Sequence, residues 1–166
     1  MAENQKNNQR DRRPPRRGGR SERPKPEFDH KMLSIRRVTR VVRGGRRFSF
    51  SILLVAGNRR GKVGVGLGKA GDVSQAMEKG LREAKKRMLE LRLTKNSSLP
   101  HELHGKFGAS RVELWPAPGR GVAAGSAARA ILTLAGVRDV GAKFRSKSKN
   151  PINNARATMR ALTELA

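Results

Sequence analysis

The chain of 166 residues has no cysteine and no tyrosine, and aromatic residues make up only 4% of it. Without cysteine it has no disulfide, no thiol chemistry and no cysteine-ligated zinc, which fits a reducing compartment. So few aromatic side chains also argue against a base-stacking platform of the RNA-recognition-motif kind. These absences remove several classes of secreted protein, thiol enzyme and zinc-dependent domain.

Acidic residues are scarce as well, because 13 Asp and Glu stand against 38 Lys and Arg, a net charge of +25. Such a charge opposes a compact fold unless a polyanion neutralises it, and nucleic acid is the usual partner. An anionic membrane surface is the alternative. No apolar run approaches the roughly 18 residues of a membrane-spanning helix, and none begins before residue 30. We therefore expect no membrane association and no signal peptide.

Residues 1–30 form a basic tail that includes Arg12, Arg13, Arg16, Arg17 and Arg20 and has almost no apolar side chain before Phe28. Such a segment cannot bury enough apolar surface to offset its chain entropy, so we expect it to be disordered alone. We interpret it as an arm that follows phosphates; a solubilising tail is the alternative.

Residues 31–97 predict a β-β-β-α domain. The run Lys31–Val42 predicts a strand with a bulge near Arg36, and the alternation in Phe48–Leu54 and Val63–Leu67 predicts a hairpin with one apolar face. Beyond them, apolar residues at helical spacing predict a helix of about five turns. We expect the valine-bearing face of the second hairpin strand to pack against this helix.

The start of that helix carries a capping-box pattern, with Asp72 as the N-cap and Gln75 three residues later.

Residues 98–166 predict an α/β domain with short strands around His101–His104 and Arg111–Trp115. An alanine-rich helix then ends at Gly136, and a last helix starts at Asn150, which is followed by proline. The predicted fold class is α+β.

Two glycine-containing basic loops at the ends of the hairpin are the strongest functional signal. Both loops belong to one small scaffold. Glycine lets the backbone approach phosphate, so we expect backbone N–H groups and arginine side chains to act together in binding it. Lys147 and Lys149 precede a helix N-terminus, a second candidate anion site. The candidate RNA-binding residues are Arg40, Arg43, Gly44, Gly45, Arg46, Arg47, Arg59, Arg60, Lys62, Lys69, Lys147, Lys149 and Asn150.

Two motifs suggest other chemistry and both fail. The glycines of Gly64–Lys69 lack the P-loop spacing, and Ala70 replaces the hydroxyl residue that would hold magnesium. They indicate instead a face that another backbone, protein or RNA, approaches closely; strand plasticity is the alternative. His101 and His104 are one residue too close for the metalloprotease motif. We expect no catalytic residue, no metal and no cofactor, and hence no enzyme.

Several separated motifs, in order, carry a family resemblance: Arg43–Phe50, Gly61–Ala70, Pro116–Ala117, Ala135–Val140 and Asn150–Thr158. From residue 31 to the end, the chain resembles bacterial-type small-subunit ribosomal protein five. The resemblance implies an N-terminal domain like double-stranded-RNA-binding domains and a C-terminal α/β domain with a left-handed β-α-β connection.

The resemblance also implies a structural and assembly protein bound to small-subunit rRNA, in the cytoplasm or in the ribosome of an organelle. It implies that the N-terminal domain lines the path by which mRNA enters, beside ribosomal proteins three and four, and that movement at the interface with protein four influences decoding accuracy. Arg120, Gly121 and Arg129 would face protein four, and protein eight would contact the C-terminal domain. A free-standing nucleic-acid-binding protein and an enzyme acting on RNA are the alternatives.

Overall fold

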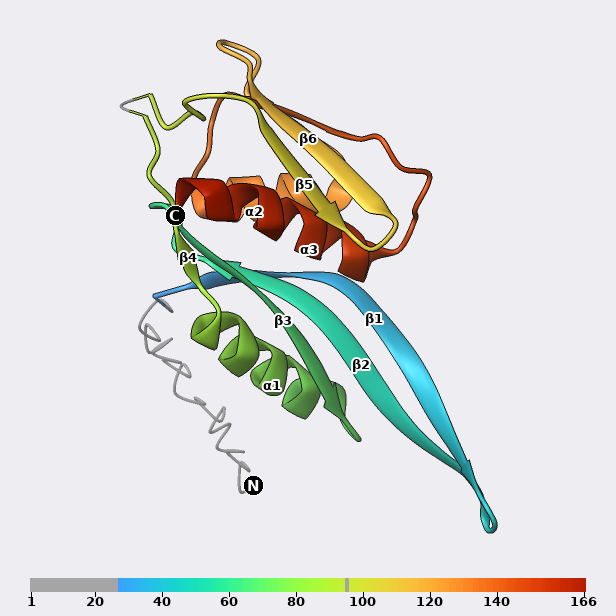
Figure 1. Cartoon of the computed structure of the whole chain (residues 1–166). Helices are drawn as coiled ribbons and strands as arrows, with labels where there is room; N and C mark the ends of the chain where they lie inside the picture. Colours follow the sequence, from blue (N-terminus) through green and yellow to red (C-terminus); the bar gives the residue numbers. More distant parts are fainter. Residues whose placement is uncertain (1–26, 95) are drawn as a thin grey trace, which may run out of the picture.

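The computed structural model describes residues 27–94 and 96–166 (Figure 1). The strands are β1 (Asp29–Val42), β2 (Gly45–Gly57), β3 (Lys62–Ala70), β4 (Leu89–Glu90), β5 (Leu103–Phe107), β6 (Ser110–Pro116), β7 (Val122–Ala123) and β8 (Val140–Phe144). The helices are α1 (Val73–Lys86), α2 (Ser126–Ala135) and α3 (Pro151–Leu162), followed by the 3-10 turn η1 (Thr163–Leu165). Residues 1–26 of the predicted arm lie outside the described residues.

The two predicted domains form four layers. The first sheet has the strand order β1-β2-β3-β4 and the second β5-β6-β8-β7. Figure 1 shows α1 beneath the first sheet, α2 and α3 between the sheets, and the second sheet above them. The α+β architecture is confirmed. Strands β7 and β8 are parallel and α2 joins them, which is the β-α-β unit that the resemblance implied; its left-handed sense stays a prediction.

The glycine-bearing face of β3, and not its valine-bearing face, lies against α1. A Cβ atom on Gly66 would come within 2.6 Å of the Ala84 nitrogen, and one on Gly68 within 2.6 Å of the Gly80 nitrogen. The expectation that the valines pack on α1 is therefore wrong. Because α1 places the small residues Ala76, Gly80 and Ala84 against β3, its backbone can rest on a strand face without side chains. The interpretation of the glycines as a close-approach face is confirmed, with α1 as the neighbour.

The valine-bearing face of β3 belongs to the larger core, which the two domains share. Val63 is fully buried there beside Leu53 and Val55 of β2, together with Ile131 of α2 and Leu162 of α3. The smaller core on the other face of β2 includes Ile52, Leu54, Ala56, Ala70, Ala76 and Ala84. Strand β2 is thus buried on both faces near its C-terminal end. This end of the first sheet is held between the two cores.

Three local predictions need correction. The bulge in β1 lies between Met32 and Ser34, not near Arg36. Helix α1 ends at Lys86, because the following residues form β4 and hydrogen-bond to β3. The capping box is absent: Asp72 is the N-cap residue, but its carboxylate accepts a hydrogen bond from the Ser74 hydroxyl and makes no bond to the backbone of the first turn.

Candidate nucleic-acid interface

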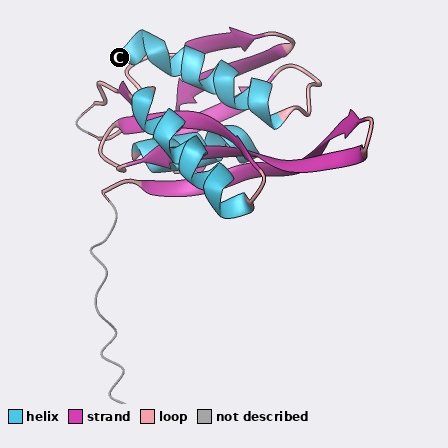
Figure 2. Cartoon of the chain, turned by 90° about the horizontal axis from the view of Figure 1, so that it is seen from below, coloured by secondary structure: helices cyan, strands magenta, loops and turns pink. Residues whose placement is uncertain are grey.

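A two-stranded ribbon projects from the first sheet. Strand β2 pairs with β3 only as far as Phe50, which lies opposite Ala70, whereas its pairing with β1 continues to Val42 opposite Gly45. The tight turn at Arg43–Gly44 leads into Gly45, whose φ of 120° is a conformation that favours glycine. Figures 1 and 2 show the ribbon extending well beyond α1 and the rest of the sheet.

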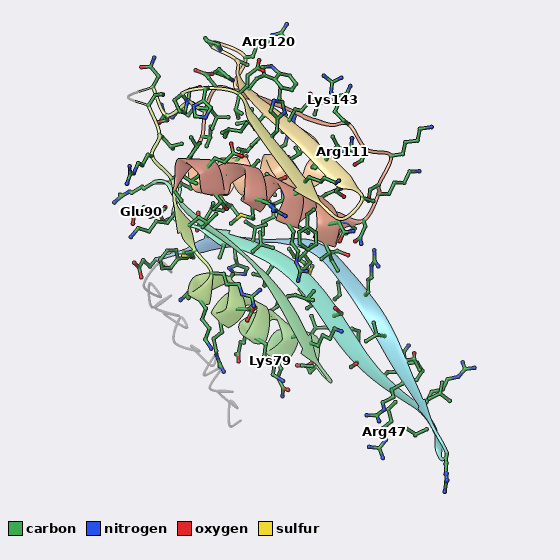
Figure 3. The ribbon with its side chains drawn as sticks, viewed as in Figure 1. Arg47, Lys79, Glu90, Arg111, Arg120 and Lys143 are labelled. Atoms are coloured by element: carbon green, nitrogen blue, oxygen red, sulfur yellow. The ribbon has the colours of Figure 1, made fainter. Side chains whose placement is uncertain are left out.

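The end of the ribbon concentrates positive charge. Arg40 lies directly opposite Arg47, Arg46 lies opposite Val41, and Arg43 is in the turn. All four arginines are exposed, and Figure 3 shows Arg47 close to the end of the ribbon. Like charges directly opposite each other destabilise a strand pair, so this arrangement works against the hairpin unless an anion is bound. We call these four arginines, with Gly44 and Gly45, the tip cluster.

Nothing in the described part of the chain neutralises or covers the tip cluster. No Asp or Glu occurs from residue 30 to residue 71, and the salt bridges of residues 27–94 and 96–166 involve none of its arginines. Cβ atoms on Gly44 and Gly45 would meet no atom within 4 Å. An approaching polyanion therefore meets guanidinium groups and open backbone together, the combination that binds phosphate.

The second predicted loop, Asn58–Gly61, lies at the other end of β2, about 40 Å away along the strand. Its backbone is bonded to the C-terminal end of α2. The Arg59 nitrogen donates to the Leu134 carbonyl oxygen at 2.8 Å, and the Gly61 nitrogen donates to the Ala135 carbonyl oxygen at 2.8 Å. Two backbone N–H groups of this loop are therefore already bonded within the protein, and its contact with phosphate stays a prediction that rests on its side chains.

The side chains of this second loop are also partly paired. The Arg59 Nε atom lies 3.0 Å from an oxygen of Asp29, and the Lys62 Nζ atom lies 3.5 Å from an oxygen of Glu90. Arg60 is exposed beside them. Lys69 is exposed on β3, close to where the ribbon leaves the sheet. The tip cluster is therefore the stronger candidate for contact with a polyanion.

The structure offers little support for nucleotide binding, metal binding or membrane spanning in its described residues. The backbone of α1 covers the glycines of β3, so a nucleotide phosphate cannot lie there. In residues 27–94 and 96–166, no three His, Asp or Glu side chains are grouped as metal ligands would be. No helix in this part of the chain has the length and apolar character needed to cross a bilayer.

Comparison with known protein families decides the class of this chain. The sequence model described as "Ribosomal protein S5, N-terminal domain" matches residues 28–92, and "Ribosomal protein S5, C-terminal domain" matches residues 105–166. The chain belongs to the ribosomal protein S5 family. It is a ribosomal protein of the small subunit, and RNA binding and a part in translation follow from the S5 family.

Individual relatives agree over most of their length. The small ribosomal subunit protein uS5 of Acaryochloris marina is 48% identical over 151 residues, which cover 90% of this chain and 85% of that protein. The uS5c protein of Cyanophora paradoxa is 49% identical over 142 residues, covering 85% and 83%. The uS5 protein of Thermosynechococcus vestitus is 49% identical over 140 residues, covering 84% and 80%.

The three residues expected at an S5-family protein interface lie near the start of α2. The Gly121 nitrogen donates to the Asp139 Oδ1 atom at 3.1 Å, and the Arg129 Nη2 atom donates to the Val122 carbonyl oxygen at 3.5 Å. The second bond places the Arg129 side chain beside Val122, the residue after Gly121. Arg120 is exposed in the same loop, and Figure 3 shows it at the far end of the molecule from Arg47.

The predicted anion site at α3 is only partly available to a ligand. Asn150 is the N-cap, as predicted, and its Oδ1 atom accepts a hydrogen bond from the Ile152 nitrogen at 3.1 Å. One of the free N–H groups that would hold an anion is therefore already bonded. Lys147 and Lys149 are exposed in the preceding loop. Their charges remain accessible to an anion. The N-terminus of α3 offers it fewer free N–H groups than an uncapped helix would, because Asn150 already accepts a hydrogen bond from one of them.

Sequence reasoning missed one pair on the ribbon. The Arg37 Cζ atom lies 3.6 Å from the centre of the Phe48 ring, a cation–π contact. These residues are eleven apart and approach because the tight turn places Phe48 opposite Thr39. The register that follows from a two-residue loop at Arg43–Gly44 was the signal that could have revealed this pair.

Proposed function

We propose that this S5-family chain binds small-subunit rRNA through the tip cluster. The supporting observation is a set of exposed arginines at the end of a projecting ribbon, with no acidic residue in that part of the sequence. The ribbon is narrow enough to reach between RNA segments, while the shared core holds its base rigid. Binding neutralises the opposed charges of Arg40 and Arg47, so the rRNA contact also stabilises the hairpin.

We further propose the finer roles that the family resemblance implies. The chain supports assembly of the subunit, lines the path by which mRNA enters and influences decoding accuracy, with ribosomal proteins three, four and eight as neighbours. The hydrogen bond from Arg129 to Val122, the residue after Gly121, supports a single interface near the start of α2. Arg59, Arg60, Lys62, Lys69, Lys147 and Lys149 serve as secondary phosphate contacts, spread over a surface much larger than the ribbon tip.

The test compares two triple variants in binding to small-subunit rRNA at several salt concentrations. The tip variant carries Arg43→Gln, Arg46→Gln and Arg47→Gln. The control carries Arg82→Gln, Arg92→Gln and Arg160→Gln, which remove equal charge from exposed positions elsewhere. Each lost phosphate contact reduces the slope of log K against log salt by roughly 0.7–0.9, so the tip variant should lose about 2–3.

The control should keep nearly the parent slope, because its arginines lie away from the ribbon. Sedimentation of subunits reconstituted with each variant then reports on assembly, where the tip variant should incorporate less well. A tip variant with the parent slope would show that these arginines do not contact phosphate, and the proposed binding mode would be wrong.

A further inference from the structure

The exposed large hydrophobic side chains of the described residues gather on one face of the β1–β2 hairpin. They are Met32, Ile35, Val41 and Phe48, with exposed fractions of 46%, 44%, 75% and 46%. Met32 lies opposite Leu54 and Ile35 opposite Ile52, and both partners point into the core beside α1. Val41 and Phe48 lie further out on the same face, because side chains alternate regularly along the paired strands. We call these four residues the apolar stripe.

Helix α1 covers only the inner part of this face. It starts at Val73, shortly after β3 ends at Ala70, and Ala70 pairs with Phe50. Beyond Phe50 the ribbon has two strands, and no element of residues 27–94 and 96–166 packs on it, as Figure 1 shows. Val41 and Phe48 are therefore bare at the end of a projecting arm. Single exposed apolar residues are ordinary, whereas a gathered set on one face marks a contact surface.

Positive charge accompanies the stripe. The Arg37 Cζ atom lies 3.6 Å from the centre of the Phe48 ring, and Arg46 lies opposite Val41. Both arginines are exposed. The other face of the ribbon carries Arg40 and Arg47 together with Ser49. Both faces are thus basic, but only the first carries an aromatic ring with an exposed aliphatic side chain, since Val38 and Val42 on the other face are half-buried.

We propose that the apolar stripe binds unpaired nucleotides of the same rRNA, with a base stacked on the Phe48–Arg37 pair. This inference rests on the proposed rRNA binding at the tip cluster. Aromatic rings and guanidinium planes are the surfaces on which unstacked RNA bases lie. A paired RNA helix would instead turn phosphates toward Val41 and Phe48. An apolar protein partner would have to bury Arg37 and Arg46 without a carboxylate from the ribbon to pair them.

The stripe does not form a platform of the RNA-recognition-motif kind, in which several rings lie on a sheet. It provides a single ring beside a guanidinium, extended by Val41 toward the turn and by Ile35 and Met32 toward the body of the sheet. The expected division of labour is clear. The tip cluster supplies binding that weakens with salt, and the stripe supplies binding that salt barely changes.

The test measures rRNA dissociation constants over a salt series for the double variant Phe48→Ala, Val41→Ser. The dissociation constant should rise by about 5- to 100-fold at every salt concentration, the range expected for one stacked base. The salt slope should stay at the parent value, because no charge is removed. Val38→Ser, on the other face of the ribbon opposite Ser49, is the matched control and should bind like the parent.

Phe48→Trp and Phe48→Leu separate stacking from bulk. The tryptophan variant should keep parent affinity, whereas the leucine variant should weaken binding although it retains apolar volume. Base-specific chemical probing of the complex should show unpaired bases protected by the parent and exposed again with Phe48→Ala. Thermal unfolding should be nearly unchanged in all of them, since these side chains lie outside both cores.

Parent-like affinity of the double variant would overturn the inference and leave the tip proposal standing. The inference would also be overturned if the double variant entered reconstituted subunits less well only when another ribosomal protein is present, because the stripe would then contact that protein. An unchanged salt slope in the arginine triple variant would instead refute the proposed function itself. The two failures are therefore distinguishable.

Discussion

Replacing Gly66 by alanine tests the packing that positions the ribbon. The new Cβ atom would lie 2.6 Å from the Ala84 nitrogen and closer still to the Gly80 carbonyl oxygen. Both neighbours are helix backbone, so neither can rotate away. Heavy atoms pack best at about 3.5 Å or more, so α1 would have to move by more than about 1 Å. Helix α1 already fits closely against the sheet at Gly80, where a Cβ atom would lie only 3.0 Å from the Leu54 side chain. The helix could therefore make room only by moving away from the sheet.

Two effects of Gly66→Ala oppose each other. Alanine reduces the entropy of the unfolded chain, which stabilises by roughly 0.4–1 kcal/mol where the site is compatible. Overpacking costs about 1–3 kcal/mol, and here it also opens gaps around Ile52 and Ala76 as α1 retreats. The steric term dominates, and the net loss should be about 2 kcal/mol. For a chain of this size that corresponds to a fall in Tm of roughly 4–8 °C.

The measurement is urea and thermal unfolding followed by circular dichroism, with Gly71→Ala as the control. A Cβ on Gly71 would meet no atom within 4 Å, and its φ is not positive, so only the entropic gain applies. The two variants should therefore shift Tm in opposite directions. If Gly66→Ala unfolds like Gly71→Ala, α1 does not lie against the glycine face of β3, and the layer order described above is wrong.

Two smaller predictions concern helix starts. Asn150→Ala should lower the free energy of unfolding by about 1 kcal/mol, since it removes the acceptor for the Ile152 nitrogen, while Asn150→Asp should retain it; equal losses in urea titrations would contradict the capping role. The pKa of Asp72 lies below its ordinary value of 3.8, chiefly because its carboxylate accepts a hydrogen bond from the Ser74 hydroxyl, so Ser74→Ala should raise it in an NMR titration. A lowered folded-state pKa stabilises the fold above 3.8, and this stabilisation is lost as pH falls through the folded value, so Ser74→Ala should reduce the acid dependence. An unmoved Asp72 titration would contradict it.

Local signals predicted the order of elements well. The alternation from Phe48 to Leu54, the cap at Asn150 and the stop at Gly136, whose φ is 86°, each depend on neighbouring residues only. The position of the β1 bulge escaped prediction because a shift of several residues leaves most of the alternation intact. Strands, caps and helix ends could therefore be predicted from neighbouring residues, whereas the exact register between strands could not.

Long-range packing set the limits of prediction. The alternation in β3 defines two faces but does not reveal which element covers each. Matching the apolar residues of the helix to the valines of β3 favoured the valine face, whereas α1 lies on the glycine face. The turn at Arg59–Gly61 looked like a free basic loop, because no local feature announces its bonds to Leu134 and Ala135. The candidate site was half predictable for the same reason. The arginines of the tip cluster were visible in the sequence, but their distance from the second loop depended on strand length and docking.

The uninterrupted course of β2 has a mechanical consequence. One end of the strand is bonded through its turn to α2, and the other carries the tip cluster about 40 Å away. A lever of this length magnifies small rotations, so a tilt of a few degrees where the strand meets α2 would sweep the arginines through several ångströms. The angle at which the C-terminal domain is seated thus governs where the distant cationic end can reach.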